Sequence, residues 1–502
     1  MLSERPQKKV NRVLVSLPAK KDRFSYIIKS KINSLGEKID QDLSMLTVEK
    51  IGGTSMSALG EVINNIVLFE RSGEQLYNRV LVVSAFSGVT NILLEDKKTG
   101  APGVYHQLAK YQDFHGPLKE LVLKLKAINQ RYTGLGLNLD VADRFIENHV
   151  ARAQVYLENL SNILASGYVS QEGILLAARE ILASIGETHS AFNLTHILQN
   201  KGIRARLIDL SGFDDPRPLT IDQRIKEAFS TVNLEDCLCI ATGYAKGTEG
   251  IMREFDRGYS EVTFSKIAEV LKPKEAIIHK EYHLSTADPA LVGIENCKPV
   301  GFTNYDIADQ LADVGMEAIH PKASKPLEIN GIHLRIKNTF EPSHPGTLIT
   351  REYISTQKRV EVITGMDKLV MIDAYDPLMV GNVGSDLQIM KLFHKHGVSY
   401  TFKATSANSI SIVIWESDFN EALIADLEAV VEKVTVEQVA MVCLLGTNMD
   451  QPGLLAKSAD ALARHDINIK SVGMALRKVN IQFLIARGDF KTAIIALNKA
   501  VG

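Results

Sequence analysis

The stretch VEKIGGTSMS (residues 48–57) places Lys50 near the end of a short apolar run, directly before Ile51, two glycines and several small hydroxyl residues. Glycines let backbone N–H groups approach a ligand closely. If the turn opens a helix, these N–H groups and the helix dipole point at an anion, and Lys50 adds a full positive charge. The stretch therefore fits a phosphate-binding turn, although an ordinary strand-to-helix turn with an exposed lysine fits it equally well.

Outward from this turn, strand-like and helix-like segments alternate. Residues 79–86 form a continuous apolar run, as in a strand buried on both faces of a parallel sheet. The helix after the turn shows a 3.6-residue apolar period at Leu59, Val62, Ile63, Ile66 and Val67. Further strands are expected at 46–51, 204–209, 237–244, 276–279, 333–339 and 347–350, with helices over much of 105–200 and at 260–271. This alternation predicts an α/β domain with a mostly parallel sheet.

A repeated rhythm begins after about residue 355. Residues 368–415 and 438–486 each show a strand, a glycine-containing loop, a helix that ends near a histidine, and then two strands. The segments LFHKHGVSY (392–400) and LARHDINIK (462–470) illustrate the match. We interpret this as a ββαβ-like unit of about 70 residues that occurs twice, which favours a tandem regulatory pair over a solenoid.

Composition excludes several classes of protein. The 502 residues are 45% hydrophobic and 23% charged, as in a soluble globular protein of two to four domains. A formal net charge of −2 argues against a polycation that binds nucleic acid. No apolar run is long enough to span a membrane, and no signal peptide is visible. Four scattered cysteines are too few for a disulfide framework, so we expect a cytoplasmic protein.

Residues 1–44 form a basic segment without a clear apolar period. Met45 directly precedes the first expected strand, so one interpretation is that translation naturally starts there. The others are a flexible tail or a targeting segment.

Three later stretches carry polar residues where strands end or helices begin. The loop VVSAFSGVTN (82–91) follows a strand, and SIGETHSAFN (184–193) places Glu187 after a glycine inside a helical region. FDRGYSEVTFSKIAEV (255–270) opens a helix with Ser260 and Thr263, which a simple capping sequence would also explain. A solvated helix carboxylate likewise explains Glu187, so each stretch alone is weak and their order carries the argument.

That order resembles aspartate kinases of the amino-acid kinase superfamily. The family patterns run K-F-G-G-T-S, V-S-A-x-x-G-x-T-N, a G-E element and G-R-G-G-S-D-x-T, and matching segments lie here at 50–55, 82–91, 186–187 and 257–263. The subgroup that the chain resembles accompanies ectoine synthesis. The resemblance implies a three-layer αβα kinase domain at 45–355, followed by two ferredoxin-like ACT domains at 356–430 and 431–502.

The resemblance also implies a reaction: ATP phosphorylates the side-chain carboxylate of L-aspartate to give 4-phospho-L-aspartate, with Mg²⁺ bridging the phosphates. Such a carboxylate, with a reference pKa of about 3.9, is already ionised at pH 7, so no general base is needed. The implied catalytic residues are Lys50, Gly52, Gly53 and Arg257. The implied aspartate-binding residues are Thr54, Ser55, Ser84, Thr90, Glu187, Arg257, Ser260 and Glu261. The implied nucleotide-binding residues are Lys50, Gly53 and Asp288; to these we add Lys280 for its charge, and no residue is assigned as a metal ligand.

The chain departs from the family on the nucleotide side. Where the family has Thr-Asp before its T-D-P element, this chain has His279 and Lys280, and Glu317 replaces a family lysine. Glu261 replaces the family aspartate in G-R-G-G-S-D. We therefore assign no nucleotide contact to His279 or Glu317, and we suggest that Lys280 replaces a lost positive charge. A kinase for another acidic amino acid and a non-catalytic amino-acid sensor remain the alternatives.

The first ACT-like unit departs as well. Residues 400–407 read YTFKATSA, where lysine- or threonine-sensing relatives often read V-D-L-I-T-T-S-E. Because both acidic positions are lost, we expect weak or altered feedback by these amino acids at the ACT domains. Paired ACT domains also lead us to expect a homo-oligomer, either a dimer or a tetramer, with no nucleic-acid or membrane partner.

Overall fold

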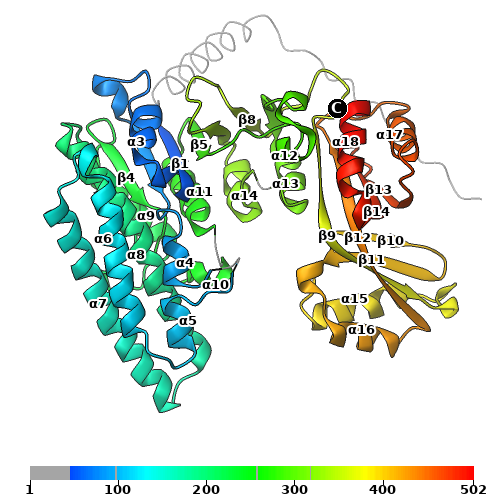
Figure 1. Cartoon of the computed structure of the whole chain (residues 1–502), viewed down its shortest axis with the longest axis horizontal. Coiled ribbons are helices and arrows are strands. Elements are labelled where there is room, and N and C mark those ends of the chain that lie inside the picture. The colour runs from blue at the N-terminus through cyan, green and yellow to red at the C-terminus, as the bar shows by residue number, and fades with distance from the viewer. Residues whose placement is uncertain (1–45, 97–98, 256–257, 317) are drawn as a thin grey trace, which may run out of the picture. The chain divides into compact units, whose positions relative to one another are not determined.

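The computed structural model describes residues 46–96, 99–255, 258–316 and 318–502 (Figure 1). The extension at 1–44, Arg257 and Glu317 lie outside the described residues. The first sheet has the strand order β3-β4-β2-β1-β5-β7-β8-β6, and its described strand pairs are parallel except β7–β8. Its strands are β1 (Thr47–Ile51), β2 (Arg79–Val83), β3 (Ala205–Ile208), β4 (Leu238–Thr242), β5 (Glu275–Lys280), β6 (Phe302–Asn304), β7 (His333–Asn338) and β8 (Thr347–Thr350). The predicted mostly parallel sheet is confirmed.

Helical segments cover both faces of β1. Successive side chains on a strand point to opposite faces of its sheet. Lys50 contacts Glu261 of α11 (Tyr259–Leu271), whereas Glu49 contacts Arg79, which in turn donates to the carbonyls of Ile66 and Val67. These two carbonyls belong to a π-helix (Val62–Val67) that follows α2 (Gly53–Ser57) and α3 (Leu59–Glu61). The arrangement agrees with the expected α/β layers.

Long helices pack beside β3 and β4. In Figure 1, α6 (His115–Arg131), α7 (Leu139–Ser166) and α8 (Gln171–Asn200) lie side by side. Asn138 caps α7 by accepting from the Val141 N–H, and α7 ends at Gly167, whose φ of 72° suits glycine. The remaining α-helices of this domain are α4 (Val89–Leu93), α5 (Val104–Ala109), α9 (Ile221–Ser230), α10 (Ile251–Glu254), α12 (Pro289–Val292), α13 (Tyr305–Asp313) and α14 (Pro321–Ile329).

The C-terminal region forms a second sheet with the order β10-β11-β9-β12-β14-β13. Its strands are β9 (Val362–Tyr375), β10 (Phe402–Thr405), β11 (Ser409–Trp415), β12 (Lys433–Leu445), β13 (Ile469–Met474) and β14 (Asn480–Ala486). Its helices are α15 (Ser385–Lys395), α16 (Glu421–Glu428), α17 (Leu454–Ala463) and α18 (Phe490–Val501). Each repeat therefore runs strand, helix, strand, strand, helix. The predicted run of a strand, a helix and two strands is confirmed, whereas the ββαβ label is corrected, because one strand and not two precedes the first helix and a second helix ends each unit.

The longest strand of the first repeat is β9, and the longest strand of the second repeat is β12. In Figure 1, both strands run between α17–α18 and α15–α16. The second half of β9 pairs with β11 and with the first half of β12. The first half of β9 pairs instead with the second half of β12, and an irregularity near Val439 separates the two registers. Residues 362–366 therefore lie beside the part of β12 that pairs with β14, a strand of the second repeat.

Two expectations from composition concern the described residues. Cys239 and Cys443 are buried, and all four cysteines are free thiols. Cys237 directly precedes β4, with 3.8 Å between its sulfur and that of Cys239. Among the helices of the described residues, none is long and apolar enough to cross a membrane.

Candidate active site

A cavity of about 240 Å³ lies at the carboxyl ends of β1, β2 and β4, between the starts of α2, α4 and α11. Ligands of open parallel sheets bind at this edge because the loops that follow the strands gather there. The cavity brings together six of the predicted residues, from four separate stretches of sequence. Its lining residues are Gly53, Thr54, Ser84, Ala85, Phe86, Ser87, Gly88, Thr90, Asn91, Glu187, Gly258, Tyr259 and Ser260.

A chain of hydrogen bonds crosses the floor of this cavity. Ser84 Oγ donates to Ser260 Oγ over 3.1 Å, and Ser260 Oγ lies 2.6 Å from Glu187 Oε1. The second carboxyl oxygen of Glu187 is buried and has no hydrogen-bond partner among the described residues. Burial raises the pKa of Glu187 to about 8, against the opposing effects of Ser260 and Lys50. Glu187 thus offers an unused acceptor that a cationic ligand group would satisfy.

Lys50 and Glu261 form an ion pair beside the cavity. Lys50 Nζ lies 3.3 Å from Glu261 Oε1, and both side chains are nearly buried. Glu261 Oε2 also accepts the backbone N–H of His320 over 2.8 Å. Burial alone would raise the pKa of Glu261, but the charges of Lys50 and Lys280 and the His320 hydrogen bond bring the pKa below its ordinary value. Glu261 is therefore ionised at neutral pH and holds Lys50 at the end of β1.

Two glycines of the site admit no side chain. A Cβ on Gly53 would lie 2.8 Å from the Ala85 carbonyl oxygen, which explains why the turn after Lys50 needs a glycine. A Cβ on Gly243 would lie 2.7 Å from the Val83 carbonyl oxygen and 2.8 Å from the Ser260 Cβ. Gly243 was not among the predicted site residues. Its position directly after the apolar strand that ends at Thr242 could have indicated it, because small residues follow β1 and β2 in the same way.

Some predicted residues lie away from the cavity. The Ser55 side chain is buried and lies 2.9 Å from the hydroxyl of Thr339. Asp288 is exposed and caps α12 by accepting the Ala290 N–H. The roles that the resemblance implies for Ser55 and Asp288 thus stay predictions without a contact to the cavity, and Arg257 lies outside the described residues.

The end of β5 differs from the rest of the site. His279 is buried, and its Nε2 lies 2.9 Å from Glu49 Oε2, while Arg79 holds the same carboxylate through two nitrogens at 2.7 and 3.0 Å. Burial would raise the pKa of Glu49, but Arg79 and His279 bring it well below its ordinary value. His279 is therefore part of a buried polar cluster with Glu49 and Arg79 inside the domain, and we assign it no nucleotide contact.

Lys280 lies on the opposite face of β5 from His279. In the parallel register between β1 and β5, Lys50 pairs with Ile278, and Ile51 pairs with His279. Since side chains alternate along a strand, Lys50 and Lys280 share one face of the sheet, and both lower the pKa of Glu261. The site therefore presents two ammonium groups near one ionised carboxylate, as the approach of a polyanion requires.

Comparisons with known proteins agree with this geometry. Residues 45–338 match the model of the amino acid kinase family, and residues 442–501 match an ACT domain model. The chain is 41% identical over 466 residues to the aspartate kinase Ask_Ect of Stutzerimonas stutzeri, covering 91% of this chain and 97% of that protein. It is 27% identical to the chloroplastic aspartokinase 1 of Arabidopsis thaliana, covering 90% of this chain and 79% of that protein.

Solved structures give the same fold. Aspartokinase III of E. coli, in complex with aspartate and ADP, superimposes with a TM-score of 0.68 at 20% identity, covering 91% of this chain and 99% of that one. The aspartate kinase of Clostridium acetobutylicum has the same TM-score and identity and is covered completely. The chain belongs to the amino acid kinase family and, within it, to the aspartate kinases.

Proposed function

We propose that this aspartate kinase transfers the γ-phosphoryl group of ATP to the side-chain carboxylate of L-aspartate in the cavity between Lys50 and Glu187, giving ADP and 4-phospho-L-aspartate. The observation that carries the proposal is the placement of Lys50 and an unsatisfied, buried Glu187 carboxyl at one strand edge. The lysine suits the transferring phosphoryl group, and the carboxyl group suits the α-ammonium of the amino acid.

The reaction does not need a general base to activate the nucleophile. The attacking carboxylate is ionised at pH 7, so catalysis consists of positioning two anions and neutralising their charge. Lys50 lies at the end of β1, and the N–H groups of Gly52 and Gly53 follow it at the start of α2. We assign Lys50 and the Gly53 N–H to the transferring phosphoryl group, whereas the Gly52 N–H already donates to the His279 carbonyl over 3.4 Å. Ser84, Thr90 and Ser260 would orient the amino acid through their hydroxyl groups.

The nucleotide would lie on the side of β5, where Lys280 shares a face with Lys50. The reaction would draw on bound Mg²⁺ for positive charge that offsets the charge of the phosphates. No group of three or more acidic, histidine or cysteine side chains that could hold a metal occurs among the described residues. The ion would be held chiefly by the phosphates of ATP, as is usual for Mg²⁺ in kinases.

Hydroxylamine trapping tests this proposal, because hydroxylamine converts an acyl phosphate into a coloured hydroxamate. We expect a signal that requires ATP, Mg²⁺ and L-aspartate, and that falls by about 10²–10³ in Lys50→Ala, as when a preorganised charge is lost from a transition state. A signal with L-glutamate alone would favour a kinase for that amino acid. Aspartate binding without any product would favour the non-catalytic sensor.

The finer assignments are also proposals. The reaction would be the first step of aspartate-family amino-acid or ectoine synthesis in the cytoplasm, and the chain would form a dimer or tetramer.

The ACT-like units, 356–430 and 431–502, would bind an amino-acid effector; among the similar structures, E. coli aspartokinase III has been solved in complex with lysine and aspartate. Lys403 Nζ lies 2.8 Å from Asp386 Oδ1, so this carboxylate already has a cationic partner within the chain. Because the carboxylate is not free to bind the ammonium group of a lysine effector, the pair supports weak feedback by lysine. An activity titration that shows strong inhibition by lysine would contradict this.

A further inference from the structure

A second cavity, of about 610 Å³, lies beside the candidate active site and shares no residue with it. It opens between α7, α8 and the loops that follow β3 and β4, at the same carboxyl edge of the sheet as the first cavity. A volume of this size and a position at this edge are typical of small-molecule sites. Nothing in the proposed kinase reaction uses this cavity.

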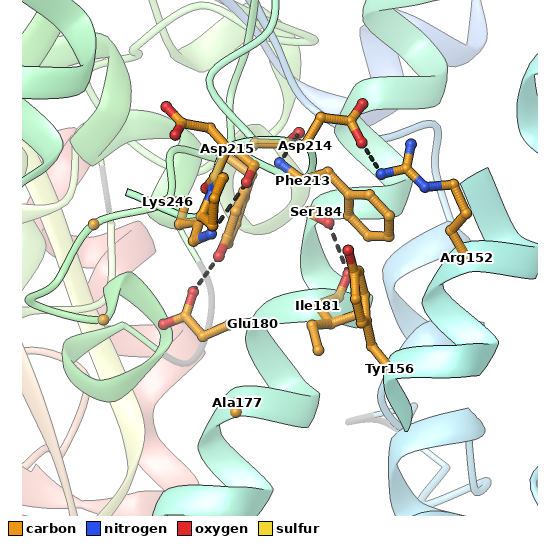
Figure 2. A pocket seen from close by; sticks show the side chains of 16 residues that line it. Arg152, Tyr156, Ala177, Glu180, Ile181, Ser184, Phe213, Asp214, Asp215 and Lys246 are labelled. Carbon is orange, nitrogen blue, oxygen red and sulfur yellow. Dashed lines mark hydrogen bonds and ion pairs between the residues drawn. The ribbon is translucent and has the colours of Figure 1, made fainter. Parts of the chain in front are cut away.

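The walls of this cavity differ in character (Figure 2). Lys246 and Glu180 lie on one side, and Phe213, Tyr156 and Ile181 lie on the other. Arg152 stands over the Phe213 ring, 5.1 Å from its centre, and pairs with Asp214 near the rim, where both side chains are well exposed. A ligand would therefore meet a polar wall and an apolar, largely aromatic wall.

Lys246 has one hydrogen-bond donor to spare. Its ammonium donates to the carbonyls of Gly212, at 3.1 Å, and Asp215, at 2.8 Å, which accounts for two of its three N–H groups. The Asp215 carboxylate pairs with Arg217 and Arg224 instead of Lys246. The positive charge of Lys246 is thus held in place by neutral carbonyls, and a ligand anion would complete its coordination.

Glu180 is already engaged by protein donors. Its carboxyl group accepts the Tyr244 hydroxyl over 2.5 Å and the Met252 N–H over 2.7 Å. The other two acids of the cavity are paired as well, Asp214 with Arg152 and Asp215 with Arg217 and Arg224. The remaining N–H of Lys246 is therefore the group of the polar wall that a ligand carboxylate would meet.

We propose that this cavity binds a second small molecule, a monocarboxylate with a flat apolar body, whose carboxylate meets Lys246 and whose body lies against Phe213, Tyr156 and Ile181. The site is connected to the catalytic cavity through α8, which carries both Ser184, in this cavity, and Glu187, in the other.

Calorimetry with benzoate as the probe tests the proposal on the full chain. Saturating L-aspartate is present throughout, so that benzoate cannot report on the catalytic cavity. We expect saturable benzoate binding that weakens at least tenfold in Lys246→Met, because the ammonium group that meets the carboxylate is then lost. Acetate, which lacks the flat body, and benzamide, which lacks the charge, should each bind much more weakly than benzoate.

A second variant keeps the test decisive if Lys246→Met disturbs the loop that its ammonium holds. Ala177→Trp, from α8, fills the cavity and leaves Lys246 in place, so it should abolish benzoate binding while basal kinase activity persists. The proposal is overturned if benzoate fails to bind even at a concentration far above that needed to saturate a site with a dissociation constant of about 1 mM. It is also overturned if Ala177→Trp leaves binding unchanged, or if benzamide binds as well as benzoate.

Discussion

The aspartate side and the β5 side of the site lie next to each other but differ in how their residues are used. On the aspartate side, Ser84, Glu187 and Ser260 come from three distant stretches and meet in one hydrogen-bonded chain. On the β5 side, His279 faces away from the site and joins Glu49 and Arg79 in the interior. The first side keeps most residues of the family patterns, with Glu261 in place of an aspartate, whereas His279 and Lys280 replace the family residues at the end of β5.

The difference teaches how a replaced residue should be interpreted. His279 is not a substitute ligand, because its hydrogen-bond partner is an internal carboxylate on the other face of the sheet from Lys50. Lys280 is the residue of this pair that remains with the site. A replaced motif position can therefore have become structural, while its neighbour takes over the charge.

The largest effect that would sharpen this comparison is expected from Arg79→Met. The change removes the cationic partner of the buried Glu49 carboxylate and leaves it hydrogen bonds from Thr47 and His279, whose pKa burial lowers; breaking a buried pair typically costs about 3–5 kcal/mol of stability. Chemical denaturation would measure the loss. Arg204→Met removes an arginine from the exposed pair with Glu74 and should leave the midpoint nearly unchanged. If the two variants lose equal stability, the cluster of Glu49, Arg79 and His279 has no special structural role.

Gly243→Ala should come next, and it acts on the aspartate side. The new methyl group would meet the Val83 carbonyl oxygen and Ser260, and such overpacking typically costs about 1–3 kcal/mol. We expect the KM for aspartate to rise at least about tenfold, with a smaller change in the KM for ATP. Gly134→Ala is the matched control, because its Cβ would meet open space. An unchanged KM for aspartate in Gly243→Ala would place the substrate elsewhere.

The pH dependence of KM should show an effect of about tenfold. Glu187 has a pKa of about 8, so below pH 8 its carboxyl group must lose a proton before it pairs with the α-ammonium of aspartate. The KM for aspartate should therefore fall about tenfold between pH 7 and pH 9 as the free enzyme loses that proton. Steady-state kinetics on Glu187→Gln should show a higher KM without this pH dependence. The same slope in the variant would assign the titration to another group.

The smallest effect is expected from Lys280→Met, on the β5 side. Losing one of two ammonium groups near the nucleotide should raise the KM for ATP by about three- to tenfold, while the KM for aspartate changes little. Lys337→Met is a suitable control, because Lys337 is half-buried on the neighbouring strand but pairs in register with His279 on the opposite face. If both variants raise the KM for ATP equally, the face of the sheet on which the lysine lies does not determine its effect on ATP binding.

Much of the aspartate side could be predicted because each of its motifs is a short stretch of sequence and the order of the motifs resembles that of aspartate kinases. Lys50 and the glycines lie in one turn, and hydroxyl residues at the ends of parallel strands meet at one edge of the sheet. Ser55 shows the limit of such reasoning. The spacing places it in the turn, but only the packed structure shows that its hydroxyl faces Thr339, 284 residues away along the chain.

The β5 side and the C-terminal sheet could not be predicted for the same reason. Nothing near His279 in sequence reveals that it meets Glu49, 230 residues earlier. In the C-terminal region, the apolar patterns indicated both repeats. They could not show that β9 pairs in two registers and that residues 362–366 lie beside the part of β12 that pairs with β14, because pairing partners are set by tertiary packing.

Counting the protons released when aspartate binds tests the central claim most directly, namely that Glu187 receives the substrate ammonium beside Lys50. Calorimetry at pH 7 in two buffers with different ionisation enthalpies gives this number. Because Glu187 is mostly protonated at pH 7, with a pKa of about 8, we predict the release of nearly one proton per aspartate bound, and almost none in Glu187→Gln. Binding without proton release, or an equal release in the variant, would contradict the account.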